Sequence, residues 1–142
     1  MIAYIVDANI CTKWMVTEEF SETAVRLLDD DIQLHAPALV WFEVGSALRK
    51  AVRRGDLDEA SAIAMLASVD VYQVTIHAEP ELAVRGLELS LATGQTAYDC
   101  AYLALAEREG VQLITADDRF VAGLAGTPWS TRVVALRDWQ PA

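Results

Sequence analysis

The chain has few cysteines, no long uncharged segment and no recognisable leader, and each shortage excludes a class of protein. Two cysteines among 142 residues are too few for a disulfide-stabilised scaffold. The longest segment without a charged side chain, residues 120–131, has 12 residues, whereas a membrane-spanning helix needs about 20. Neither a basic segment nor a small-residue cleavage site follows Met1, so no signal peptide is expected. The sequence therefore predicts a cytoplasmic protein without a membrane segment.

Basic residues are also scarce: 11 Lys and Arg stand against 21 Asp and Glu, which gives a net charge of −10. Proteins that bind nucleic acid by overall charge are usually basic, so this balance argues against that mode of binding. Two interpretations of the acidic residues remain. They form an ordinary solubilising surface, or some of them gather in a site where a divalent cation reverses the local charge.

Apolar residues are abundant, at 54%, so the chain can bury a full core and is not disordered. Its length suits one domain over residues 1–142. Short strands alternate with helices, which predicts a single three-layer α/β/α domain with a central, mostly parallel sheet. The expected strands are residues 2–6, 32–36, 71–76, 111–115 and 132–136, and the expected helices are residues 17–28, 38–54, 58–69, 81–93, 96–109 and 119–124.

Two aspartates follow predicted strands. Asp7 ends the first strand and Asp117 ends a late one, and an aspartate at such a turn is often only a helix cap. Ligands of open parallel sheets, however, bind beyond the carboxyl ends of the strands. If both strands are central, the two carboxylates project from the same edge of the sheet.

Two further acids lie in apolar stretches of predicted helices. Glu43 falls at the border of an apolar helical stripe, where an unpaired carboxylate is costly to bury. The structural alternative is a glutamate at the edge of the core that reaches water or pairs with Arg49 or Lys50. Asp99 heads another apolar stripe and follows Thr96 by three residues, a spacing that also resembles a capping box. These alternatives are compatible with metal binding, because a carboxylate at a helix start can also hold a metal.

The four acids together favour a metal site. Ligation by oxygen alone suits Mg²⁺ or Mn²⁺. These ions serve phosphoryl transfer, in which they activate water and neutralise developing charge. An acidic cleft that holds such an ion accepts RNA or DNA without electrostatic contradiction.

Four segments in series resemble the PIN-domain family, and within it the VapC-type toxin ribonucleases. The resemblance extends from Ile5 to about Leu136. The segments are Val6-Asp7-Ala8-Asn9, Phe42-Glu43-Val44-Gly45-Ser46-Ala47-Leu48, Tyr98-Asp99-Cys100-Ala101-Tyr102-Leu103-Ala104-Leu105-Ala106 and Leu113-Ile114-Thr115-Ala116-Asp117-Asp118-Arg119-Phe120.

The resemblance implies a Mg²⁺- or Mn²⁺-dependent endoribonuclease that hydrolyses RNA phosphodiester bonds. It also implies a homodimer that a cognate VapB-type antitoxin keeps inactive. Asp118 stands where relatives vary, so the resemblance assigns it no role. By match to the motifs, the catalytic and metal-binding residues are Asp7, Glu43, Asp99 and Asp117, and the accessory polar positions are Asn9 and Thr115.

Two alternatives belong to other functional classes. A phosphoacceptor receiver domain needs an acidic pair after its first strand and a lysine after its last, whereas this chain has one acid there, Asp7, and its two lysines are Lys13 and Lys50. A catalytically inactive PIN-fold binding module is the second alternative, and the complete acidic quartet argues against it.

The remaining conspicuous residues have ordinary structural interpretations. The basic run from Arg49 to Arg54 suits a solvated helix end, with RNA or antitoxin contact as the functional alternative. Trp14 and Trp41 are candidates for base stacking or an antitoxin groove, although packing is expected for Trp41. Small core residues are expected at Cys11 and Cys100, while His35 and His77 show no metal-ligand spacing.

Overall fold

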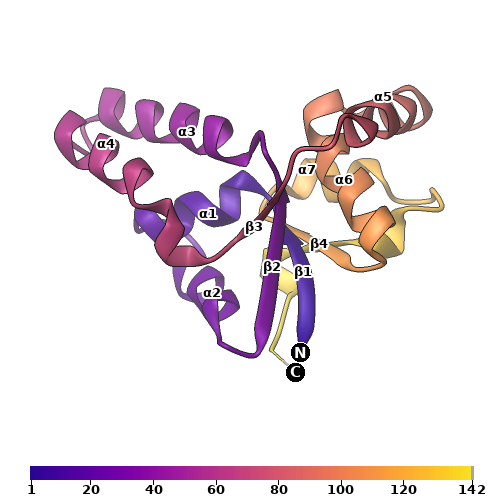
Figure 1. Ribbon diagram of the computed structural model, residues 1–142, viewed down its shortest axis with the longest axis horizontal. Coiled ribbons are helices and arrows are strands. Elements are labelled where there is room, and N and C mark those ends of the chain that lie inside the picture. Colours follow the sequence, from indigo (N-terminus) through magenta and orange to yellow (C-terminus); the bar gives the residue numbers. More distant parts are fainter. Residues whose placement is uncertain (142) are drawn as a thin grey trace.

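The protein is described here by a computed structural model, which covers residues 1–141. Its centre is a five-stranded, fully parallel sheet in the order β3-β2-β1-β4-β5. Strand β1 lies in the middle, runs upward in Figure 1, and ends at the edge where the chain passes into its first helix. The strands are β1 (Ile2–Val6), β2 (Ile32–Pro37), β3 (Thr75–His77), β4 (Gln112–Thr115) and β5 (Val133–Ala135).

The strand order creates a switch point beside β1. The chain extends the sheet from β1 through β2 to β3 on one side, and then returns to place β4 and β5 on the other side. Ligands of such sheets bind at the carboxyl ends of the strands on either side of the switch. These ends carry Asp7 after β1 and Asp117 after β4, so the fold places both aspartates at one edge, as the sequence predicts.

Helices cover both faces of the sheet, which confirms the predicted three-layer architecture. Helix α6 packs on β1, β2 and β4 and carries α5 outside it, whereas α1 contacts α2 and α3. The pair α3–α4 and the pair α5–α6 lie on opposite sides of the carboxyl ends of β1 and β2 (Figure 1). The helices are α1 (Ala8–Met15), α2 (Ser21–Val25), α3 (Val40–Arg54), α4 (Glu59–Ala67), α5 (Pro80–Thr93), α6 (Ala97–Glu109) and α7 (Asp118–Gly123).

Two predicted elements are wrong in part. The predicted helix over 17–28 is interrupted: α1 begins directly after Asp7, and the chain is extended at Val16 and left-handed at Phe20 (φ 65°) before α2. The start of α1 at Ala8, capped by Asp7, agrees with the turn or helix start that Asp7-Ala8-Asn9 indicates in the sequence. The predicted strand over 71–76 is a 3-10 turn followed by a strand of only three residues, because Gln73 is left-handed (φ 55°).

Helix α6 is the central helix of the core. Every residue from Cys100 to Ala106 is buried, because the sheet lies on one side of this helix and α5 on the other. Thr96 caps it, with its Oγ1 accepting from the amide of Asp99 at 3.1 Å. Cys11 and Cys100 are buried and free, which confirms their expected place in the core. No helix within residues 1–141 is long and apolar enough to cross a membrane.

Candidate active site

Asp7 is the buried centre of the candidate site. It follows the last residue of β1 and caps α1, and only 6% of its surface is exposed. Its Oδ1 accepts from the amide of Ala8 at 2.7 Å, and its Oδ2 accepts from the hydroxyl of Thr115 at 2.8 Å. The amide of Asn9 donates to the same Oδ2 at 3.3 Å. All of these donors are neutral, so the charge of Asp7 has hydrogen-bond partners but no cation.

The electrostatic state of Asp7 reflects this arrangement. Burial raises its pKa from 3.8 to about 7, the hydrogen bond from Thr115 opposes the rise, and the charges of Asp99 and Glu43 add to it. A buried carboxylate whose pKa is raised by other carboxylates is typical of functional sites. The raised pKa means that ionisation of Asp7 destabilises the folded protein. A carboxylate at this position therefore does not serve the stability of the fold.

Thr115 and Asn9 join the ends of β1 and β4. Besides donating to Asp7, the Thr115 hydroxyl accepts from Asn9 Nδ2 at 3.2 Å and from the amide of Asp117 at 3.0 Å. Asn9 Oδ1 in turn accepts from the amide of Ala116 at 2.9 Å. The two accessory positions suggested by the resemblance therefore lie in one hydrogen-bonded network with Asp7 and the backbone of Asp117.

Glu43 reaches the site from the first turn of α3. It is half-buried, and its Oε1 accepts from the hydroxyl of the fully buried Tyr102 at 2.6 Å. Burial raises the pKa of Glu43, the bond from Tyr102 opposes the rise, and the charge of Asp99 adds to it. Its partner is thus a tyrosine of α6, and neither Arg49 nor Lys50 pairs with it.

Asp99 and Asp117 complete the acidic quartet from two helix starts. Asp99 lies in the first turn of α6, where burial and the neighbouring charge of Asp117 raise its pKa. Asp117 caps α7, its Oδ1 accepting from the amides of Arg119 and Phe120. The structural roles considered for Asp99 and Asp117 are therefore present, and they leave carboxylate oxygens for other partners.

The four carboxylates are electrostatic neighbours without a compensating cation. The charges of Asp99 and Glu43 raise the pKa of Asp7, the charge of Asp99 raises that of Glu43, and the charge of Asp117 raises that of Asp99. None of the four forms an ion pair within residues 1–141. Their oxygen atoms nevertheless lie farther apart than in a closed metal site, because no three of these acids bring one oxygen each within 4.8 Å of the others. In the described chain, only His35, His77 and Glu109 bring three ligand atoms within 4.8 Å of one another.

Asp118, next to the quartet, has a different partner. Its carboxylate accepts from the guanidinium of Arg137, which also lies over the ring of Phe20 at 5.9 Å from its centroid. This exposed ion pair joins α7 to the segment after β5. Asp118 is therefore occupied structurally and does not join the other acids.

A groove beside Glu43 carries aromatic residues that the sequence analysis overlooked. Phe42 is 81% exposed and Tyr98 is 68% exposed, and both line this groove together with Lys50. The sequence offers one indication of this surface, because Phe42 directly precedes Glu43 and Tyr98 directly precedes Asp99. The groove is lined by Leu39, Phe42, Glu43, Ser46, Ala47, Lys50 and Tyr98.

The tryptophans considered for stacking serve packing instead. Trp14 is half-buried, donates from Nε1 to the carbonyl of Ala24 at 2.8 Å, and packs on Tyr72 with ring centroids 5.0 Å apart. Trp41 packs against the core, as expected. The exposed aromatic surface next to the acids is therefore that of Phe42 and Tyr98.

Comparison with known families agrees with this geometry. The family model described as the PIN domain matches residues 4–122, a span that contains all four acids. The chain belongs to the PIN domain family.

Individual relatives refine the assignment to the VapC-type members. Ribonuclease VapC3 of Pyrobaculum aerophilum is 37% identical over 115 residues, covering 80% of this chain and 88% of that protein. Ribonuclease VapC1 of Mycobacterium tuberculosis is 32% identical over 132 residues, covering 92% and 96%. The crystal structure of PAE2754 from Pyrobaculum aerophilum superimposes with a TM-score of 0.68 at 25% identity, covering 96% of this chain and 85% of that one.

Proposed function

We propose that residues 1–142 form one PIN domain that acts as a divalent-metal-dependent endoribonuclease, the toxin of a VapBC-type toxin–antitoxin pair, in the cytoplasm. The observation that carries this proposal is the buried Asp7 at the carboxyl end of the central strand, which pairs with no basic side chain in residues 1–141 and whose pKa the charges of Asp99 and Glu43 help to raise. A bound cation stabilises the ionised form of carboxylates whose pKa values are raised together, so such a group favours cation binding.

The residues present fit Mg²⁺ or Mn²⁺. All four proposed ligands, Asp7, Glu43, Asp99 and Asp117, offer oxygen only, and the two buried cysteines carry raised thiol pKa values that keep them protonated. Mg²⁺ keeps several waters and needs only one or two direct carboxylates, which suits a group of acids more widely spaced than a closed cage. The bound ion supplies activation of water and neutralisation of phosphate charge.

The surrounding residues hold these acids in position. Thr115 and Asn9 fix the rotamer of Asp7 by donating to Oδ2, which leaves Oδ1 beside the amide of Ala8. Tyr102 holds Glu43 in the same way from the buried side. We assign Asp7, Asp99 and Asp117 to metal binding. Glu43 then lies closest to the groove, where it holds the metal or accepts a proton from the attacking water.

The groove beside Glu43 suits a single strand of RNA. Exposed Phe42 and Tyr98 offer aromatic faces on which bases stack, and Lys50 offers a cation for a phosphate. Because the bases of a duplex are already stacked on one another, these contacts favour single-stranded RNA over a duplex.

A cognate VapB-type antitoxin suits a second groove, between α3 and α4. Most residues that line this groove are apolar, among them Ile63, which is 71% exposed, and its charged residues are Arg49, Arg53 and the single acid Glu59. An amphipathic segment that places apolar side chains on the walls and acids at the rim has the complementary chemistry. We further propose a homodimer in solution.

Cleavage of a labelled single-stranded RNA by the untagged protein tests the enzymatic proposal. We expect cleavage with Mg²⁺ or Mn²⁺, none with chelator, and loss in Asp7→Asn and Asp99→Asn variants that keep their fold by circular dichroism. Asp58→Asn is the matched control, since Asp58 is an exposed aspartate that caps α4. Undiminished cleavage by a purified, folded Asp7→Asn protein contradicts the assignment.

Growth of cells that express the chain tests the toxin role separately. We expect expression of the wild type to slow growth, and co-expression of the cognate antitoxin to restore it. Normal growth, despite high expression and RNA cleavage in vitro, would support a nuclease with another role.

A further inference from the structure

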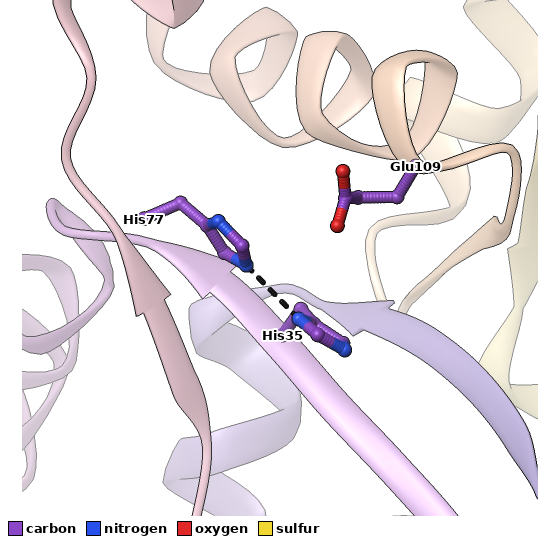
Figure 2. Close-up of side chains that lie close together, drawn as sticks. All are labelled: His35, His77 and Glu109. Carbon is purple, nitrogen blue, oxygen red and sulfur yellow. Dashed lines mark hydrogen bonds between the residues drawn. The ribbon is translucent and has the colours of Figure 1, made fainter.

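Two histidines and a glutamate form a second cluster, outside the acidic quartet. His35 lies in β2, His77 ends the neighbouring strand β3, and Glu109 is the last residue of α6. His35 Nδ1 and His77 Nε2 are 2.9 Å apart, and the two rings are inclined by 31°. Figure 2 shows the carboxylate of Glu109 turned toward the two imidazoles. One ligand atom from each residue lies within 4.8 Å of the other two.

We propose that His35, His77 and Glu109 bind one zinc ion, at a site distinct from the oxygen-only acidic centre. Two imidazole nitrogens and one carboxylate, with a fourth position open to water, are a recurrent ligand set of Zn²⁺. Two nitrogens bound tetrahedrally at about 2.05 Å stand about 3.3 Å apart, so the observed pair needs to separate by only a few tenths of an ångström. Glu109 is exposed and has a flexible side chain, which allows it to close the remaining gap.

The proton positions of the metal-free pair follow from Arg108. Its Nη2 lies 2.9 Å from His77 Nδ1. A guanidinium only donates, so His77 Nδ1 must accept and His77 must carry its proton on Nε2. That proton is then donated to His35 Nδ1, which leaves the His35 proton on Nε2. Both rings are neutral in this arrangement, and the two nitrogens that face each other share one proton.

Zinc binding replaces that shared proton. The Nε2 proton of His77 leaves to solvent and Nδ1 takes up another, so the ring stays neutral and no net proton is released. The new Nδ1–H needs an acceptor, and Glu79 Oε1 stands 3.9 Å away. A carboxylate that accepts from the outer nitrogen of a zinc-bound histidine is the usual supporting contact. Glu79 is therefore a positioning residue of the proposed site.

Arg108 opposes the metal in two ways. Its donation to His77 Nδ1 stabilises the Nε2–H tautomer of His77, which cannot bind zinc through Nε2. Its positive charge also lies beside the proposed site. It also contacts Glu79 at 3.5 Å and Glu109 at 3.4 Å, so its displacement leaves the guanidinium with an acidic partner. Removal of Arg108 is therefore expected to strengthen zinc binding, an effect opposite to that of removing a ligand.

The proposed ion cross-links β2, β3 and the end of α6, and of these three elements the edge strand β3 has the fewest contacts to hold it. Strand β3 has only three residues and pairs with β2 alone, while Glu109 anchors the carboxyl end of α6. When the Zn²⁺ concentration is well above the dissociation constant of this site, zinc is expected to raise the melting temperature of the protein by several degrees. This inference is independent of the proposed nuclease activity.

Zinc titration of the untagged protein tests the site. Calorimetry with Zn²⁺ alone is carried out on an Asp7→Asn background, which removes the central acid of the quartet. We expect one ion per chain, and at least tenfold weaker binding in His35→Gln, His77→Gln and Glu109→Gln. Glu79→Gln is expected to lose 10–100-fold in affinity, whereas Arg108→Gln is expected to gain affinity.

Imidazole NMR gives a second measurement that does not depend on the stability of any variant. The chain has only two histidines, so every imidazole signal belongs to the pair. Without metal we expect both histidines in the Nε2–H form. With Zn²⁺ we expect His77 to change to the Nδ1–H form. Unchanged imidazole signals at saturating Zn²⁺, or equal zinc affinity with and without His77→Gln on the Asp7→Asn background, would overturn the proposal and leave only a hydrogen-bonded histidine pair.

Discussion

Replacement of Asp7 by asparagine should stabilise the metal-free protein in a way that depends on pH. The pKa of Asp7 is about 7 in the folded protein against 3.8 for the unperturbed group, and each unit corresponds to about 1.4 kcal/mol. Because the folded pKa is the higher one, ionisation destabilises the fold as pH rises from about 4 to 7. The full penalty is about 4 kcal/mol above pH 7, and about 1.5 kcal/mol of it is already present at pH 5.

Asparagine removes this penalty and loses part of the hydrogen bonding. Its single oxygen can keep the bond from the amide of Ala8, while its amide group faces the donors of Thr115 and Asn9. That mismatch costs about 1–2 kcal/mol. The variant should therefore be nearly as stable as the wild type at pH 5, and about 2 kcal/mol more stable at pH 8. For a domain of this size the gain corresponds to roughly 4–8 °C in melting temperature.

Thermal melts at pH 5 and pH 8, with chelator or Mn²⁺, measure this effect. Mn²⁺ at roughly a hundred times its dissociation constant stabilises the wild type by about 2.7 kcal/mol, which should reverse the order at pH 8 because the variant gains less. Asp58→Asn is the control, since hydrogen bonds from Ser61 lower the pKa of Asp58, so its effect should be flat between pH 5 and pH 8. Asp7→Asn melting lower by one fixed margin in all four conditions would refute the reasoning.

Three further changes test the surroundings of the acids. Tyr102→Phe removes the only described hydrogen bond to the Glu43 carboxylate. This change should lower Mn²⁺ affinity or RNA cleavage 10–100-fold with the fold intact; full activity would show that the Glu43 carboxylate needs no support. Phe42→Ala should raise KM by about 5- to 100-fold through lost base stacking, while kcat changes little. The control is Leu91→Ala on α5, a residue of similar exposure, which should change neither KM nor kcat. Lys50→Gln should reduce the salt dependence of RNA binding by about one unit of slope, and an unchanged slope would exclude a phosphate contact there.

The positions of the acids could be predicted because each depends on local sequence. Asp7 and Asp117 directly follow short apolar strands, and parallel strands end at the same edge of a sheet. Asp99 lies three residues after a helix cap, a spacing visible in the sequence. These features need only the alternation of strands and helices, which the apolar periodicity indicates correctly over most of the chain.

Contacts between distant segments could not be predicted in the same way. The partner of Glu43 is Tyr102, 59 residues later, on a helix whose rotation is fixed only by packing. His35 and His77 meet because β2 and β3 pair in a register that sets Pro37 opposite His77, and no local spacing encodes that register. The break at Phe20 depends likewise on a left-handed residue that lacks the glycine signature of such positions.

The net charge of −10 is compatible with the proposed RNA substrate because of where the charges lie. In the described chain Arg49, Lys50 and Arg53 of α3 form no ion pair, and Lys50 lines the groove beside Glu43. Exposed acids more than about 8 Å away are largely screened at physiological ionic strength. The substrate therefore meets the local charge of the groove, where a bound divalent ion offsets two units of the quartet's negative charge. If the proposed metal dependence holds, the four carboxylates repel phosphate until the ion is bound, and metal binding is expected to govern access of the RNA as well as its hydrolysis.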